Sequence, residues 1–89
     1  MSETQDSLID FPCDFPIKVF GVAQQGFAQA MAEAVQLHAP DFSAASIEMR
    51  ASSGVKYLSL TCTVHVTSRE QLDDIYRTLS GHPMVKMVL

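Results

Sequence analysis

The chain has 89 residues, of which 47% are apolar and 18% charged, and its formal net charge is −4. This length gives room for one hydrophobic core and excludes a second domain, and the apolar fraction excludes a wholly disordered chain. Ten acidic side chains stand against six scattered Lys and Arg residues, which disfavours nucleic-acid binding because phosphate recognition needs clustered cations. No apolar run is long enough to cross a bilayer, so we expect no contact with a membrane.

Residues 1–13 form a polar lead-in that we expect to be flexible, and residues 14–89 form the single domain. The first residues are polar and acidic, without the basic start and apolar stretch of a signal peptide. The two cysteines, Cys13 and Cys62, make no C-x-x-C motif and suggest no disulfide framework. We therefore expect a cytoplasmic protein in which Cys62 is buried and reduced.

The first strand is predicted over residues 17–22, where apolar side chains alternate with a period of two. This period places Ile17 and Val19 on one face of the strand and Phe20 and Val22 on the other. A helix is predicted next, from Gln24 to His38, because apolar residues then recur at helical spacing. Pro40 ends this pattern, since the residue before a proline avoids helical geometry.

Two further strands form a predicted hairpin. The first runs over residues 46–52, and Ser53-Gly54 supplies the turn chemistry that follows it. The return strand over residues 57–66 has the clearest alternation in the chain. Its inward-facing residues are predicted to be Leu58, Leu60, Cys62, Val64 and Val66.

A second helix is predicted to begin at Ser68, which forms a capping box with Gln71 three residues later. An apolar stripe follows at helical spacing, and Gly81 ends the helix as a left-handed cap. The last strand runs over residues 84–89. Alternation predicts that its inner face carries Val85, Met87 and Leu89.

The two helices each carry one apolar stripe, so both must cover the same side of one sheet. Right-handed crossovers then give an α+β fold of the ferredoxin-like βαββαβ type, with a four-stranded antiparallel sheet of order 4-1-3-2 and two helices on one face. The predicted inner face of the sheet comprises Ile17, Val19, Ile47, Met49, Leu58, Leu60, Cys62, Val64, Val85 and Met87.

No catalytic constellation stands out in the sequence. Cys62 and His65 point to opposite faces of one strand, so they cannot form a nucleophile–base pair. His38 and His82 are interpreted as surface or cap residues, and no cluster has the spacing of metal ligands. A phosphate-binding glycine fingerprint is also absent. We therefore expect no enzymatic activity, no cofactor and no bound metal.

The outer face of the sheet is predicted to be more apolar than a solvated face requires. Either these are ordinary scattered surface residues, or the face contacts another copy, another protein or a small ligand. We favour the contact surface. Its predicted residues are Phe20, Val22, Tyr57, Met84 and Val88.

A second candidate site is the loop between the first strand and the first helix. Backbone amides at a helix N-terminus favour anionic groups such as carboxylates. The loop residues that we assign to this ligand site are Ala23, Gln24, Gln25 and Gly26.

Three motifs resemble those of the YbeD-like family of small bacterial proteins. They are the opening Phe-Pro-Cys-Asp-Phe-Pro-Ile-Lys-Val over residues 11–19, His-Ala-Pro over residues 38–40, and the ending Val-Lys-Met-Val-Leu over residues 85–89. That family is similar in fold to ACT domains, the small-molecule-sensing modules of metabolic enzymes. ACT modules bind amino acids near the loop after strand one, which corresponds here to residues 22–26.

The sequence thus predicts a non-catalytic regulatory or protein-interaction module that acts through the open face of its sheet. The partner is an unidentified protein or a second copy of the chain in a dimer. The alternative is an ACT-type sensor of a small, amino-acid-like metabolite.

Overall fold

A computed structural model of the chain describes residues 10–51, 54 and 56–89. The elements follow in the predicted order, with one short 3₁₀ helix, η1, added before the second strand. They are β1 (Cys13–Val22), α2 (Phe27–Gln36), η1 (Ala44–Ser46), β2 (Glu48–Ala51), β3 (Tyr57–Val66), α3 (Arg69–Ser80) and β4 (Val85–Val88). Of the predicted hairpin turn, Ser53 lies outside the described residues, while Gly54 has the positive φ of 81° that favours glycine.

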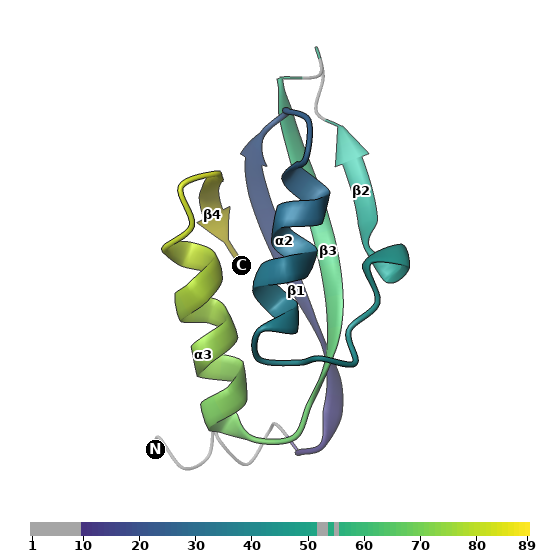
Figure 1. Cartoon of the computed structure of the whole chain (residues 1–89), viewed down its shortest axis with the longest axis vertical. Helices are drawn as coiled ribbons and strands as arrows, with labels where there is room; N and C mark the ends of the chain where they lie inside the picture. Colours follow the sequence, from purple (N-terminus) through teal and green to yellow (C-terminus); the bar gives the residue numbers. More distant parts are fainter. Residues whose placement is uncertain (1–9, 52–53, 55) are drawn as a thin grey trace.

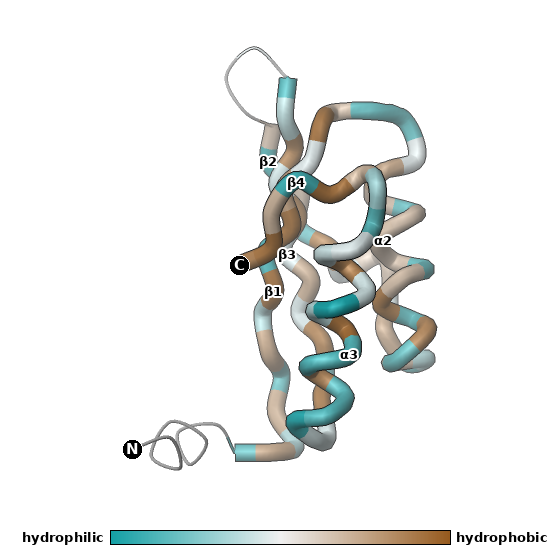
Figure 2. The backbone as a smooth tube through the Cα atoms, turned by 90° about the vertical axis from the view of Figure 1, so that its left-hand side faces the viewer, coloured by the Kyte–Doolittle hydropathy of each residue, from teal (hydrophilic) through white to brown (hydrophobic). Residues whose placement is uncertain are grey.

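The four strands form one antiparallel sheet of order β2-β3-β1-β4, which confirms the predicted order read from the opposite edge. Both helices lie on the same side of this sheet (Figures 1 and 2). The two ten-residue strands β1 and β3 pair along their whole length at its centre. Within the described residues, no helix is long and apolar enough to cross a membrane.

The core fills the space between the two central strands and the two helices. Its apolar side chains come from alternate positions on β1 and β3 and from one stripe on each helix, as the two periodicities predict. Burying each large one contributes roughly 1.5–3 kcal/mol. The largest fully buried side chains are Phe27, Ile17, Met31, Leu60, Ile75, Leu79, Val19, Val35, Val64, Val66 and Cys62.

The first strand and the first helix differ from their predicted bounds. β1 begins at Cys13, and Phe11 and Cys13 pack against the core, so the body of the domain starts before Asp14. Residues 1–9 of the predicted lead-in lie outside the described residues. α2 ends at Gln36 rather than at His38, because the His38 N–H bonds back three residues to the Val35 carbonyl and closes a tighter turn.

The capping box of the second helix is present in altered form. Ser68 Oγ accepts the Gln71 N–H at 3.1 Å, as predicted. Gln71 Oε1 reaches one residue further back and accepts the Thr67 N–H at 2.7 Å. At the other end of α3 the prediction of a left-handed Gly81 is wrong. Its φ is −87°, an ordinary right-handed value, and its N–H bonds the Arg77 carbonyl.

A bulge at the edge of the sheet confirms the predicted inward face of Val85 but reverses the predicted faces of Met87, Val88 and Leu89. Val88 lies opposite Val19 and Met87 opposite Phe20, but the next pair is Gly21 with Val85, which leaves Lys86 as an extra residue. Directly opposed residues share a face. Val88 therefore points towards the helices, and Met87 points away from them.

The bulge corrects the predicted faces of Met87, Leu89 and Val88. Met87 and Leu89 are not on the inner face, since Leu89 exchanges backbone hydrogen bonds with the outward-facing Lys18. Val88 is not on the outer face, because it packs against the core. Met84, just before the strand, also packs against the core.

The inner-face prediction also fails in part at β2. Met49 lies opposite Leu60 and so on the helix side, but its side chain is 53% exposed. β2 is a short edge strand beyond α2, and neither helix covers it (Figure 1). The alternation therefore predicted the face of Met49 correctly, but that side chain is not buried.

Candidate functional site

The open face of the sheet carries five apolar side chains that are continuous across three strands. Val22 on β1 lies opposite Tyr57 on β3, and Phe20 lies opposite Met87 on β4. We call this surface the outer patch. It comprises Phe20, Val22, Tyr57, Met87 and Leu89.

Four members of the outer patch are exposed, with exposed fractions of 38% for Val22, 43% for Tyr57, 50% for Met87 and 60% for Leu89. Phe20 is half-buried between them. Among the described elements, no helix lies over this side of the sheet (Figure 2). An apolar surface of this kind, left bare on a small domain, is typical of an interaction site.

The structure brings together three of the five residues predicted for this surface, namely Phe20, Val22 and Tyr57. Met84 and Val88 do not belong to it, since both pack against the core. Sequence reasoning missed Met87 and Leu89, because strict alternation assigned them inward. Nothing in the letters Val-Lys-Met marks the bulge that reverses them.

Positive charge borders the outer patch. The exposed Lys18 pairs with Thr61 and Leu89, and the exposed Arg50 pairs with Ser59, so both side chains share the outer face. The cations of α3 are engaged differently, since Arg69 and Arg77 form ion pairs with Asp73 and Asp74 on the same helix. Glu48 shares this face, because it lies opposite Thr61, so the outer patch is bordered by two cations and one carboxylate.

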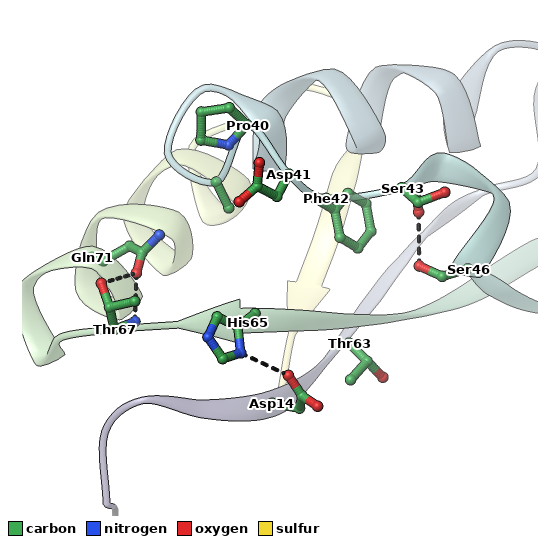
Figure 3. A pocket seen from close by; sticks show the side chains of 11 residues that line it. Asp14, Pro40, Asp41, Phe42, Ser43, Ser46, Thr63, His65, Thr67 and Gln71 are labelled. Atoms are coloured by element: carbon green, nitrogen blue, oxygen red, sulfur yellow. Dashed lines mark hydrogen bonds and ion pairs between the residues drawn. The ribbon is translucent and has the colours of Figure 1, made fainter.

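A cavity lies at the far end of the sheet from Tyr57, between β3 and the loop that joins α2 to η1 (Figure 3). Its volume is about 340 Å³. Two of the side chains that line it form a pair: His65 Nδ1 lies 3.0 Å from Asp14 Oδ1. These residues lie directly opposite each other on β3 and β1. The lining residues are Asp14, Ala39, Pro40, Asp41, Phe42, Ser43, Ser46, Thr63, His65, Thr67 and Gln71.

The histidines and cysteines do not assemble a nucleophilic site within the described residues. Cys62 is buried on the helix side, and this burial raises the pKa of its thiol from 9.0 to about 11, which suppresses the reactive thiolate. His65 lies on the opposite face, as predicted. His38 Nε2 lies 2.7 Å from Thr78 Oγ1, and His82 Nδ1 accepts the Met84 N–H, so both act as structural links.

The predicted ligand loop over residues 23–26 has a simple structure. Gly26 occupies the N-cap position of α2 with φ 85°, and no side chain caps the helix there. The N–H of Phe27 bonds the Gln24 carbonyl, and the Ala23 N–H bonds the Lys56 carbonyl. The loop lines neither the 340 Å³ cavity nor a shallower hollow of about 300 Å³ between the helices. Small-molecule binding at this loop stays a prediction.

The chain matches, over residues 6–89, the family described as "Protein of unknown function (DUF493)". A UPF0250 protein of Nitrosomonas europaea is 54% identical over 86 residues, which cover 97% of this chain and 99% of that protein. A UPF0250 protein of Bordetella pertussis is 56% identical over 85 residues, which cover 96% of this chain and 93% of that protein.

A solved structure supports the fold. The solution structure of protein HP0495 from H. pylori superposes with a TM-score of 0.74 at 18% identity, covering 91% of this chain and 85% of that chain. The two molecules therefore share the α+β architecture. The chain belongs to the DUF493 family of proteins of unknown function, in agreement with the YbeD-like resemblance of its motifs.

Proposed function

We propose that the chain is a non-catalytic protein-interaction module that regulates a partner protein in the cytoplasm by binding it through the outer patch. The observation that carries this proposal is the continuity of the outer patch across β3, β1 and β4 on a face that neither helix covers. The solvent-exposed face of an antiparallel sheet usually carries polar side chains. Single exposed apolar residues are common on protein surfaces, but a row of neighbouring apolar residues indicates an interaction site.

The charge of the face supports a partner with an acidic border around an apolar centre. Lys18 and Arg50 flank the outer patch, and opposite charges steer association and fix the orientation of a complex. Two copies packed face to face would bring together two surfaces on which Lys18 and Arg50 outnumber Glu48. A different protein therefore fits this face better than a symmetric dimer does.

The test uses two exposed members of the outer patch, Val22 on β1 and Met87 on β4. The double variant Val22→Asp with Met87→Asp places carboxylates in the patch, and both positions are exposed, so the fold is retained. A matched control is Leu37→Asp, because Leu37 is a 74% exposed apolar residue at the end of α2 on the helix side.

Wild-type protein, the double variant and the control are each immobilised and used to capture proteins from the native cell extract. The proposal expects a partner that the wild type and the control retain and that the double variant loses, with retention falling as salt rises. Sedimentation of the three proteins measures self-association separately. Identical capture by all three proteins contradicts the proposal.

A further inference from the structure

We propose a second binding site, distinct from the outer patch: the exposed edge of β3 at Thr63 and His65 accepts an extended peptide segment of a partner as an added strand. The segment enters the 340 Å³ cavity between β3 and the α2–η1 loop. Backbone groups on a sheet edge that have no strand partner bind an extended chain by β-augmentation.

The hydrogen-bonding pattern shows which backbone groups face this edge. Lys18 and Leu89 exchange both backbone hydrogen bonds, at 3.1 and 2.8 Å, so the N–H and C=O of Lys18 point towards β4. The neighbouring Ile17 and Val19 then point theirs towards β3, where they meet Cys62 and Leu60. Along β3 the alternate residues Thr61, Thr63 and His65 therefore direct their backbone groups away from β1.

Two of these three residues are not paired with a strand on the side away from β1. Thr61 pairs with Glu48 at the start of β2. Beyond this pair the chain of η1 turns back on itself, because the Ser46 N–H bonds the Ser43 carbonyl instead of continuing the ladder. At the other end of the edge, Gln71 Oε1 caps the Thr67 N–H. The open stretch lies between these two closures and is lined by Thr63 and His65 (Figure 3).

The cavity also sets the chemistry of the incoming side chains. Residues opposite Thr63 and His65 would share the outer face with the carboxylate of Asp14. Asp41 adds a second exposed carboxylate to the cavity lining, which contains neither Lys nor Arg among the residues that the structure describes. The residue between them would turn towards the buried ring of Phe42. The site therefore fits a segment with basic residues at alternate positions and a small apolar residue between them.

The probe is a synthetic blocked pentapeptide, Val-Lys-Val-Lys-Val, titrated into isotope-labelled protein and followed by amide chemical shifts. Two control peptides isolate the two contributions to binding. In one control peptide, the backbone amide nitrogens of both lysines are methylated, which removes two backbone N–H donors but keeps the side-chain charges. In the other, glutamate replaces both lysines. The protein variant is the double substitution Asp14→Asn with Asp41→Asn, which removes both carboxylates of the cavity. The control variant is Asp73→Asn, since Asp73 lies on α3 away from the cavity.

The proposal expects saturable shifts centred on the amides of Thr63 and His65. Methylation should weaken binding about tenfold, because two backbone hydrogen bonds are lost. The glutamate peptide and the double Asn variant should bind severalfold more weakly, and Asp73→Asn should bind as the wild type does. No saturable shifts, shifts centred elsewhere, or equal binding of the methylated peptide would each overturn it. The Val22→Asp with Met87→Asp variant should bind the probe normally, so failure of this site and failure of the outer patch are distinguishable.

Discussion

Gly21 on β1 is closely approached by the backbone of Met84, just before β4, and by the ring of Phe27 on α2. A Cβ atom there would contact the Met84 carbonyl oxygen and lie 2.6 Å from Phe27 Cζ. Both neighbours are fixed, one as backbone and the other as a ring that is 1% exposed. Gly21→Ala should therefore lower the free energy of unfolding by about 1–3 kcal/mol, measured by urea denaturation.

The control for this substitution is Gly81→Ala. Gly81 has a negative φ of −87° and an exposed position at the end of α3, and the nearest atom to an added Cβ, the Arg77 carbonyl oxygen, is 3.3 Å away. Its loss of stability should be clearly smaller. An equal loss at both positions would show that crowding at Gly21 is not the cause.

Cys62 makes the stability depend on alkaline pH. Burial raises the pKa of its thiol from 9.0 to about 11, so the native state keeps a proton that the unfolded chain releases. The free energy of unfolding should therefore fall as pH rises from about 9 to about 11, by up to about 1.4 kcal/mol per pH unit. Denaturation at several pH values measures this slope. Burial raises the pKa of Tyr76 as well, so Cys62→Ala should reduce the slope without abolishing it.

At the scale of the elements, α3 depends on the hydrogen bonds at its first turn. Ser68 Oγ accepts the Gln71 N–H, and Gln71 in turn bonds Thr67 and the His38 carbonyl, which ties the helix start to the end of α2. Ser68→Ala should cost about 1 kcal/mol of unfolding free energy. Ser80→Ala, at the exposed far end of the helix, serves as the control and should change stability little. Thermal unfolding of both variants measures the difference.

The elements also show where prediction from sequence succeeds and where it stops. Alternation on β1 and β3 correctly predicted that Ile17, Val19, Leu60 and Cys62 are buried. It succeeded because apolar residues recur at every second position along most of each strand, and this face packs against the helices. On β4 the same reasoning failed after Val85. A bulge is decided by how two strands fit together in space, and a strand of four residues carries too little pattern to reveal it.

The residues of one candidate site could be predicted from the sequence, whereas the other site could not. Phe20, Val22 and Tyr57 were predictable, since they lie on the two strands with clear periods. The cavity beside β3 was not predictable. It depends on η1 turning the chain away from the sheet, and on a loop over residues 39–43 whose path no local pattern specifies.

For the whole molecule, the arrangement of the sheet predicts a gradient of local stability. The central pair β1 and β3 is buried and continuous over ten residues, whereas all four residues of β2 are exposed. Amide hydrogen exchange should be slowest in β1 and in the residues of β3 that bond it, and fast in β2. Within β3, the amides of Cys62 and Val64 should exchange slowly, and those of Thr63 and His65 quickly. Uniform protection along β3 would contradict the predicted direction of its backbone groups.

The extra residue at Lys86 has an evolutionary consequence. Because of the bulge, Val85 and Val88 both point inwards although they are three residues apart, and both pack against the core. Removing Lys86 would restore strict alternation, with Val85 still opposite Gly21, Met87 opposite Phe20 and Leu89 opposite Lys18. Loss of one codon at this position would therefore be tolerated in evolution, because the core and the outer patch would keep the same residues.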